Sequence, residues 1–316
     1  MSSVSESIPH SPDNVLRFPN LGTEPPVDWE RDVFGRPHST KIKGTHLTWG
    51  ELGEGPPLVM LHGLQDSHRC WRRVAPRLAE RFRVIMVDLP GHGLSGRPNA
   101  PYTLSWNANL LAAWMAEIGV PRAHLCGHSY GGGVAQWMVL EHRERVDRLA
   151  LVCPGGLGKD VTVPMRMAAI PILGKALTPW VLRWSIPLVL RYQPAIFGYM
   201  EPEEQERYIR LNRLPGTDRA FHRTLTGVIN LHGQFMQTQD RAAEVKQPPP
   251  VAIFWGEKDP ILPVEHGHEA ASRGDHVELV LYPDSGHFPH LDAPERFGDD
   301  LLAFLTDPDR PPARLG

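Results

Sequence analysis

Short runs of apolar residues alternate with longer amphipathic segments through the first half of the chain. The runs cover residues 57–61, 83–87, 123–126 and 149–152, and helical patterns separate them at residues 71–81, at 104–118 and after 129. The runs are continuously apolar, which is typical of strands buried on both faces of a parallel sheet. Strands that alternate with helices in this way predict a doubly wound α/β fold with a mostly parallel sheet.

The alternation stops near residue 156 and resumes with apolar runs at residues 250–255 and 277–282. The segment between them has helical character, many prolines and no convincing strand, and it is too long for a loop. We therefore predict an inserted helical cap. The expected division is an N-terminal extension at 1–40, a core at 41–158 and 246–308, the cap at 159–245 and a tail at 309–316.

The cap sequence is strongly apolar and contains Trp180 and Trp184. Three prolines and several cations interrupt it, which argues against a membrane-spanning helix. We expect most of its apolar residues to form the cap's own core and some to line a substrate pocket. An apolar cap edged by cations also fits weak contact with a lipid surface. The apolar residues are Met165, Met167, Ile170, Ile172, Leu173, Trp180, Val181, Leu182, Trp184, Ile186 and Leu188, and the cations are Arg166, Lys175, Arg183 and Arg191.

Composition excludes some classes of partner. The chain has 316 residues, of which 41% are hydrophobic, and its 33 basic and 36 acidic residues give a formal charge of -3. These values are ordinary for a globular protein, and the charge offers no positive field for a nucleic-acid backbone. We expect no nucleic-acid partner.

The cysteines and the N-terminal residues indicate the cellular compartment of the protein. Cys70, Cys126 and Cys153 have no spacing that suits a disulfide framework or a zinc site, so a reducing compartment is expected. Residues 1–10 have neither the basic start nor the apolar run of a secretory signal. The sequence therefore predicts a cytoplasmic protein.

One serine lies among glycines in the stretch LCGHSYGGG, residues 125–133. Glycine weakens strands and helices alike, so four glycines in nine residues indicate a sharp bend. The stretch follows a predicted strand and precedes a predicted helix, where a strained turn exposes a serine at the ligand-binding edge of a parallel sheet. The pattern Gly127-x-Ser129-x-Gly131 therefore predicts a nucleophile elbow with Ser129 as the nucleophile.

A serine hydroxyl needs a base to take its proton, and the base needs an acid to orient it. Asp259 and His287 each follow a late predicted strand, and the chain order Ser, Asp, His is the one that accompanies an elbow. We predict His287 as the base and Asp259 as its acid, with Glu257 as the alternative acid. His128, Phe288, Trp180 and Trp184 are assigned to the substrate pocket.

The reaction also requires donors for a developing oxyanion, and backbone N–H groups supply them best. One is expected from Tyr130, directly after the nucleophile. The other is expected from the loop after the first core strand, at Leu64, with Gln65 as the alternative. We expect no metal and no organic cofactor, because the sequence contains no ligand cluster and no phosphate-cradling loop.

These motifs resemble those of the α/β-hydrolase superfamily, in its capped branch. The matching pieces are Leu61-His62-Gly63, the run from Asp88 to Ser95, Gly127 to Gly132, Asp259 and Gly286-His287. The resemblance implies a hydrolase core from about residue 42 to 306. Haloalkane dehalogenases and epoxide hydrolases of that branch carry aspartate at the elbow, so Ser129 argues against both activities.

The resemblance implies a serine hydrolase of small apolar acyl compounds, with carboxylic esters expected first. Meta-cleavage product hydrolases, which split carbon–carbon bonds, also use serine. They generally have tryptophan directly after the catalytic histidine, where this chain has Phe288. A carbon–carbon hydrolase is therefore an alternative, and a receptor-like protein that binds a small apolar molecule is a second one.

Overall fold

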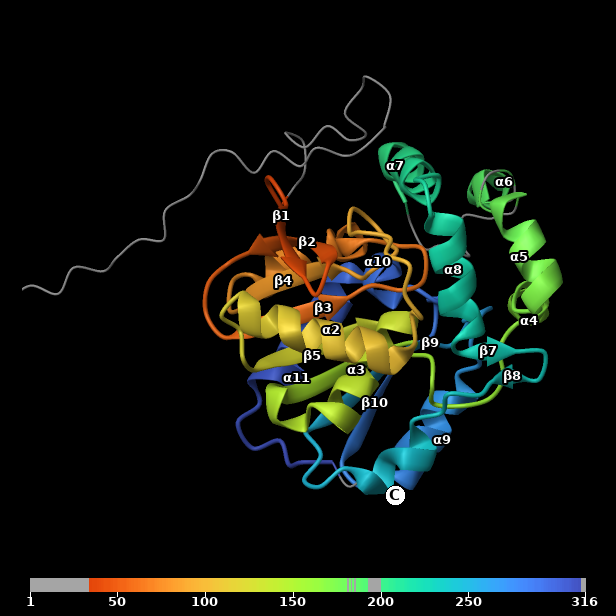
Figure 1. Ribbon diagram of the computed structural model, residues 1–316. Coiled ribbons are helices and arrows are strands. Elements are labelled where there is room, and N and C mark those ends of the chain that lie inside the picture. Colours follow the sequence, from red (N-terminus) through yellow and green to blue (C-terminus); the bar gives the residue numbers. More distant parts are fainter. Residues whose placement is uncertain (1–33, 181, 183, 185, 193–199, 314–316) are drawn as a thin grey trace, which may run out of the picture.

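An eight-stranded sheet forms the centre of the computed structural model, which describes residues 34–313 apart from 181, 183, 185 and 193–199 (Figure 1). The strand order is β1-β2-β4-β3-β5-β6-β9-β10; β1 and β2 run antiparallel to their neighbours and the rest pair in parallel. This confirms the doubly wound, mostly parallel sheet. The strands are β1 (His38–Ile42), β2 (Thr45–Leu52), β3 (Pro57–Leu61), β4 (Arg83–Asp88), β5 (Ala123–His128), β6 (Val146–Val152), β9 (Val251–Gly256) and β10 (Val277–Tyr282).

Helices cover both faces of the sheet because both faces are apolar. In β3, Val59 and Leu61 belong to the buried cluster that contains α2 and α3, whereas Leu58 and Met60 pack with α1 and α11. Successive strand residues point to opposite faces, so a continuously apolar strand serves two cores. The core helices are α1 (Ala75–Leu78), α2 (Leu104–Glu117), α3 (Tyr130–Glu141), α9 (Glu265–Arg273), α10 (Pro289–Asp292) and α11 (Pro294–Thr306), with the 3-10 helices η2 (His68–Trp71), η3 (Arg143–Arg145) and η6 (Gln239–Glu244).

One core helix is much shorter than its sequence pattern indicated. We expected a helix over residues 71–81, but the structure has a 3-10 turn that ends at Trp71 and a four-residue α1. Pro76 lies in the first turn of α1, where it lacks the N–H needed to continue a helix from before it. The apolar periodicity correctly predicted that this segment is buried, but it overestimated the length of the helix.

The register brings the carboxyl ends of the parallel strands to one edge. His128 at the end of β5 pairs with Val152 of β6, which pairs with Phe254 of β9, and Tyr282 at the end of β10 pairs with Gly256. The loops after these strands therefore leave the sheet side by side. In an open parallel sheet this is the edge where ligands bind.

The chain between β6 and β9 is mostly helical and lies beside this edge (Figure 1). It contains α4 (Val163–Ala168), α5 (Pro171–Trp180), α6 (Ile186–Tyr192), α7 (Pro202–Asn212) and α8 (Thr217–Thr226). We expected no strand here, but β7 (Ile229–Asn230) and β8 (Gly233–Gln234) form a short antiparallel pair. Two-residue strands are too short for apolar alternation to reveal them.

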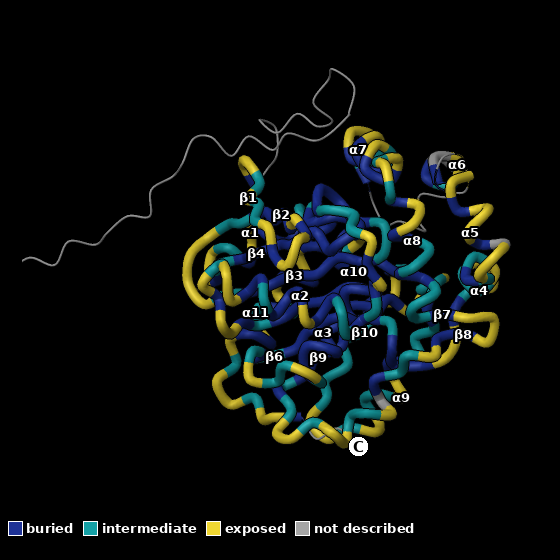
Figure 2. The backbone as a smooth tube through the Cα atoms, in the orientation of Figure 1, coloured by how far each residue is buried: buried dark blue, intermediate teal, exposed yellow. Residues whose placement is uncertain are grey.

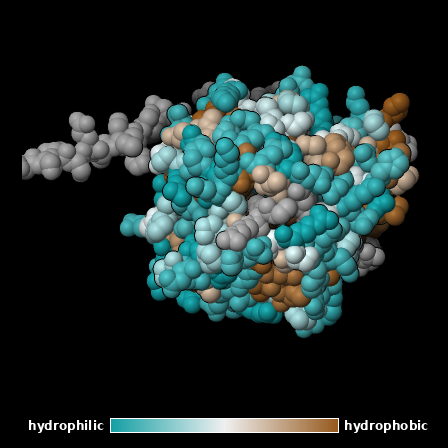
Figure 3. All heavy atoms as spheres, turned by 90° about the horizontal axis from the view of Figure 1, so that it is seen from below, coloured by the Kyte–Doolittle hydropathy of each residue, from teal (hydrophilic) through white to brown (hydrophobic). Residues whose placement is uncertain are grey.

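The outer surface of this insertion is unusually apolar. Figure 2 shows α5 largely exposed and α7 partly buried, and Figure 3 shows hydrophobic residues gathered at that edge of the molecule. Among the apolar cap residues named from the sequence that have described side chains, only Leu182 and Ile186 are buried, so the expectation that most of them form the cap's own core is wrong. Val181 and Arg183 lie outside the described residues, as do the side chains of Leu173 and Arg191. The exposed large apolar residues of α4 to α6 and their connections are Val163, Met167, Ile172, Leu177, Trp180, Trp184 and Leu188. None of the described helices is both long and apolar enough to span a bilayer.

Both ends of the described chain pack more closely on the core than composition indicated. Residues 38–40, which we assigned to the N-terminal extension, begin β1, and Phe34 is already buried. At the other end, the buried Ala313 donates its N–H to the Pro249 carbonyl at 3.2 Å, and Arg310 forms an ion pair with Glu278. Residues 309–313 of the expected tail are therefore held on the core; residues 1–33 and 314–316 lie outside the described part.

Candidate active site

Ser129 stands at a strained turn between β5 and α3. Its φ of 52° and ψ of −117° lie far from the regions that side-chain-bearing residues normally adopt. The turn is fixed on both sides: the Ser129 N–H donates to the Val152 carbonyl at 2.9 Å, and the Ser129 carbonyl accepts from the Gly155 N–H at 3.0 Å. The glycine-rich stretch therefore forms the sharp strand-to-helix bend that its sequence predicted.

The flanking glycines are required by close approach of backbone. A Cβ on Gly127 would lie 2.5 Å from the Gly131 carbonyl oxygen, and one on Gly131 would lie 2.5 Å from the Leu61 and His62 carbonyl oxygens. Backbone atoms on all sides leave no flexible group to move aside. The elbow excludes any larger residue at these two positions.

Gly127→Ala is expected to destabilise the protein by about 3 kcal/mol, because the added methyl must displace backbone at the turn. Gly133→Ala is the matched control: there the nearest atom to the new Cβ is a Leu104 methyl carbon at 3.3 Å, within a helix that alanine favours. Urea unfolding of both variants checks this. Equal losses of unfolding free energy would contradict the account of the turn.

The predicted acid and base meet each other. His287 Nδ1 lies 2.7 Å from Asp259 Oδ2, and both side chains are almost fully buried. The carboxylate can only accept, so Nδ1 carries the proton and Nε2 is left as the basic nitrogen. Asp259 Oδ1 accepts from the N–H groups of Ile261 and Leu262 at 2.8 and 3.0 Å. The carboxylate is thus fixed on one side and orients the imidazole on the other.

The alternative acids do not compete for this histidine. Glu257 is exposed, and Asp284 is an exposed partner of Lys258 at 2.7 Å. A third carboxylate supports the loop from outside: Asp292 Oδ2 accepts from the Gly286 N–H at 3.1 Å. The helix α11 has no side-chain cap, and the carboxylate of Asp292 bonds instead to the loop that carries His287.

His128 connects the serine turn to the histidine loop. The ring of His128 lies 4.8 Å from that of His287 and 4.7 Å from that of Phe288, between centroids. Its Nε2 is 2.8 Å from the His287 carbonyl, so this nitrogen is the donor. Burial, chiefly, holds the pKa of His128 well below its usual value, which keeps the ring neutral. His128 therefore fixes the backbone of His287.

A cavity of about 530 Å³, including the open space at its mouth, lies at Ser129. Leu64 and Tyr130, the two expected sources of oxyanion-binding amides, both line it. Tyr130 is the first residue of α3, where a backbone N–H has no partner within the helix. The remaining lining residues come mainly from α4, α8, β8 and the loops after β6 and β9, and they are Leu104, Gly133, Gly155, Gly156, Val161, Met165, Thr224, Leu225, Val228, Ile229, Gln234, Met236, Ile261 and Leu262.

The four residues assigned to the pocket lie elsewhere. Trp180 and Trp184 are each 59% exposed and do not line the Ser129 cavity. His128 and Phe288 are buried behind the histidine loop and are also absent from its lining. The pocket assignment is therefore revised, because α4 and α8, rather than the tryptophan-bearing segment, face the serine. Among the apolar cap residues named from the sequence whose side chains the structure describes, Met165 lines the cavity and the others do not.

The loop after β3 is held by the helical insertion and by a buried histidine. Asn212 Nδ2 donates to the Gln65 carbonyl at 2.9 Å, and Arg207 Nη1 donates to Ser67 Oγ at 3.0 Å. His62 bridges two loops, since its Nδ1 contacts the Gly63 carbonyl at 2.7 Å and its Nε2 accepts from the Leu89 N–H at 2.9 Å. Burial lowers the pKa of His62 to about 4, so the imidazole stays neutral in this bridge.

A buried carboxyl lies two residues beyond Leu64. Burial raises the pKa of Asp66 to about 7; nearby Glu204 also raises it, and Arg72 and Arg207 lower it. Asp66 Oδ1 accepts from the Ser67 N–H at 2.8 Å, whereas Oδ2 has no partner among the described residues. The folded protein therefore keeps this carboxyl protonated at pH values where the unfolded chain has lost the proton.

The stability of the wild-type protein is expected to fall between about pH 4 and pH 7 because of Asp66. In that window the unfolded chain releases the proton while the folded state retains it. Above pH 7 the full loss of unfolding free energy is present. Asp66→Asn should remove this dependence of stability on pH. It should raise the free energy of unfolding by roughly 2 kcal/mol at pH 8, with little change at pH 4. Urea unfolding at both pH values checks it, with exposed Asp284→Asn as the control; parallel pH profiles for Asp66→Asn and wild type would contradict it.

Cys153 lies beside the acid and base but suits no metal. Cys153, Asp259 and His287 each offer a ligand atom within 4.8 Å of the others. Burial raises the pKa of the Cys153 thiol well above its usual value, and a protonated thiol is a poor metal ligand. Asp259 already uses both oxygens in the bonds described above. The donor set fits an acid–base pair better than a metal centre.

Comparison with known proteins agrees with the fold. The family model described as alpha/beta hydrolase fold matches residues 56–294. The chain therefore belongs to the α/β-hydrolase family. An uncharacterised protein of Mycobacterium tuberculosis is 34% identical over 292 residues, which cover 84% of this chain and 81% of that one.

Relatives with described activities differ in their chemistry. A soluble epoxide hydrolase of a Corynebacterium species is 30% identical, covering 85% of this chain and 96% of its own. A 2-hydroxy-6-oxo-6-phenylhexa-2,4-dienoate hydrolase of Burkholderia cepacia is 28% identical, covering 80% and 90%. Among solved structures, the epoxide hydrolase CorEH superposes with a TM-score of 0.71 at 26% identity, covering 85% of this chain and 98% of that one.

Proposed function

We propose that the protein is a serine hydrolase that cleaves a carboxylic ester or related acyl bond of a small, largely apolar substrate. The observation that carries this proposal is the bond between His287 and Asp259 at the edge of the sheet where Ser129 stands on its strained turn. An oriented imidazole with a free basic nitrogen is what a serine hydroxyl requires. Ser129 would replace the elbow aspartate that the resemblance implies for an epoxide hydrolase.

The first half of the reaction forms an acyl-enzyme. Ser129 Oγ attacks the substrate carbonyl carbon while His287 Nε2 takes the hydroxyl proton. The oxygen that becomes negative accepts hydrogen bonds from the Leu64 and Tyr130 amides, the proposed oxyanion hole. His287 then gives the proton to the leaving alcohol as the carbon–oxygen bond breaks.

The second half releases the acid. His287 takes a proton from water, the water oxygen attacks the acyl carbon, and the Ser129 oxygen leaves and recovers the proton from His287. Each proton that His287 accepts is returned, so no metal or cofactor is needed and water is the only second reactant. Asp259 stays ionised and stabilises the imidazolium that forms in both halves.

The cavity supports an apolar substrate. Most of its lining is apolar, and the helical insertion contributes Leu225, Val228 and Ile229 to it. We propose that residues 159–245 act as a cap that excludes water and shapes the acyl pocket. Gln234 is not available to a substrate, since its side chain already bonds the Gly156 N–H at 2.9 Å and the Gly158 carbonyl at 2.8 Å.

A second candidate is hydrolysis of a carbon–carbon bond in a dienoic diketone. The similarity to the Burkholderia cepacia hydrolase named above favours it. Phe288, where such enzymes generally have tryptophan, argues against it. The third possibility is a receptor that binds an apolar molecule without turnover, which the intact Ser, His and Asp set disfavours.

A substrate panel tests the proposal. We expect p-nitrophenyl esters with short to medium acyl chains to turn over with higher kcat/KM than a 2-hydroxy-6-oxo-dienoate. An activated phosphonate should label one residue per chain, and mass spectrometry should place the label on Ser129. Preference for the diketone would replace the ester proposal with the carbon–carbon one. Neither turnover nor labelling, with tight binding of an apolar molecule, would favour the receptor.

We also propose that the cap makes weak contact with a lipid surface, and that the protein lies in the cytoplasm. The exposed apolar residues of α4 to α6, with Lys175 exposed among them, support the contact. Cys70, Cys126 and Cys153 are all free thiols, which supports the location. Co-sedimentation with anionic vesicles tests the contact, which should weaken in Trp180→Ser. A chain that stays wholly in the supernatant contradicts it.

A further inference from the structure

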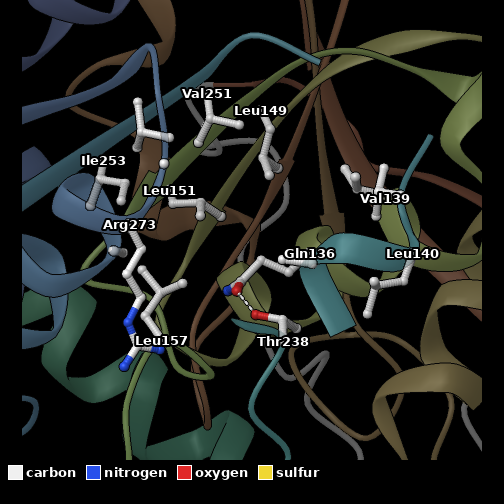
Figure 4. A pocket seen from close by; sticks show the side chains of 15 residues that line it. Gln136, Val139, Leu140, Leu149, Leu151, Leu157, Thr238, Val251, Ile253 and Arg273 are labelled. Carbon is white, nitrogen blue, oxygen red and sulfur yellow. Dashed lines mark hydrogen bonds between the residues drawn. The ribbon is translucent and has the colours of Figure 1, made fainter. Parts of the chain in front are cut away.

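A second cavity, of about 630 Å³ including the open space at its mouth, lies between α3, the sheet and α9 (Figure 4). Figure 4 shows Leu149, Leu151 and Val251 of the sheet on one side and Val139 and Leu140 of α3 on the other. The other lining residues are Gln136, Leu157, Thr238, Ala242, Val245, Ile253, Ala270, Arg273, Gly274 and Val277.

The polar side chains in this wall already bond to other protein groups. Gln136 Nε2 donates to the Gly155 carbonyl at 2.8 Å, and Thr238 Oγ1 donates to Gln136 Oε1, as Figure 4 shows. Arg273 is half exposed and forms an ion pair with Glu269. A water molecule inside the cavity would find few partners, and such cavities favour apolar ligands.

A thin polar partition separates this cavity from the one at Ser129. Gly155 and Gly156 line the Ser129 cavity, whereas Gln136 and Thr238 line the second one. The two layers bond directly: besides the bond from Gln136 to the Gly155 carbonyl, the Thr238 N–H donates to the Gly156 carbonyl at 2.9 Å. The cavities are therefore adjacent but distinct.

We propose that the second cavity is a binding site for the aliphatic chain of an uncharged amphiphile, separate from the proposed catalytic site. Its aliphatic wall buries the chain, and the mouth near Arg273 and Gly274 leaves the polar end in water. An occupant would lie one hydrogen-bonded layer from the nucleophile turn, because Gly155 also donates to the Ser129 carbonyl. Binding at this site depends on the apolar residues that line the cavity and does not require Ser129 to react.

Linear alcohols are suitable probes, with binding measured by calorimetry. Affinity should rise roughly fourfold for each added methylene from n-hexanol to n-decanol, as expected for burial of a growing chain. Binding should be unchanged in Ser129→Ala, which separates this proposal from the hydrolase proposal. Affinity that does not depend on chain length would overturn the assignment of an aliphatic ligand.

Variants that fill the cavity test the location. Ala270→Phe places a ring in the cavity from α9 and should weaken n-decanol binding at least tenfold. Ala271→Phe, on the neighbouring residue that does not line the cavity, is the matched control and should bind as wild type does. Alcohol binding that survives Ala270→Phe at wild-type strength would place the ligand elsewhere and overturn the proposal.

A second pair of variants tests the same cavity in case Ala270→Phe fails to fold. Ala242→Phe fills the same space from η6, and Ala243→Phe is its exposed control. Thermal unfolding without ligand shows whether each variant folds. Weakened binding in both filling variants, with wild-type binding in both controls, supports the site; equal weakening in filling and control variants shows that the cavity is not the binding site.

Discussion

Replacing Ser129 by alanine is expected to lower kcat/KM for a p-nitrophenyl ester roughly 10⁵- to 10⁶-fold, since no other group can form the acyl-enzyme. The residual rate should come from the oxyanion amides and from substrate binding alone. KM should change little, because the cavity wall is otherwise intact. Steady-state kinetics of wild type and Ser129→Ala measure the effect.

Ser129→Gly gives a control that separates chemistry from strain. It loses the same hydroxyl, so its activity should match that of Ser129→Ala. Glycine adopts the φ of 52° without steric cost, so Ser129→Gly should be more stable than Ser129→Ala by about 1 kcal/mol. An alanine variant that keeps more than a hundredth of the wild-type activity would remove Ser129 from the proposed mechanism.

The sheet was predictable because its signal is strong and local. The strands β3, β4, β6 and β9 each contain a continuous apolar run, so residues such as Val59 and Met60 indicate burial on both faces without knowledge of their partners. Helix length was less predictable where proline intervened, as at Pro76. The edge strand β1 was missed because HSTKI is mostly polar and half exposed, so it has no apolar run.

The acid–base pair was predictable from chain order, whereas its supports were not. Asp259 and His287 are far apart in sequence, yet each follows a strand, and parallel strands deliver such residues to one edge. The bond from His128 to the His287 carbonyl joins two loops whose approach no local pattern encodes. Only the shared edge, not the supporting contact, can be read from the sequence.

The pocket was the least predictable part because apolar residues of a cap look alike in sequence. Trp180 and Met165 both fit a substrate wall by chemistry, but only Met165 lines the Ser129 cavity. Which helix faces inward depends on how α4 and α8 pack on each other and on the core, and that packing is set by tertiary contacts. Periodicity identifies an apolar face without saying what it touches.

Asp259→Asn is expected to lower kcat roughly 10⁴-fold while leaving the fold intact. An amide in place of Oδ2 turns an acceptor toward His287 into a donor, so the imidazole must present its other tautomer and loses the basic nitrogen at Nε2. The asparagine oxygen can still accept the Ile261 and Leu262 N–H groups, which holds the loop. Pre-steady-state kinetics with a p-nitrophenyl ester should show a slowed acylation burst.

Glu257→Gln is the matched control, because it makes the same change two residues away on an exposed side chain. It should retain wild-type kcat, since His287 Nδ1 bonds to Asp259 at 2.7 Å. Ser129→Ala and Asp259→Asn combined should be no slower than Ser129→Ala alone, because the acid acts only through the base that serves the serine. A further loss in the double variant, or a large loss in Glu257→Gln, would mean that the three residues do not work as one unit.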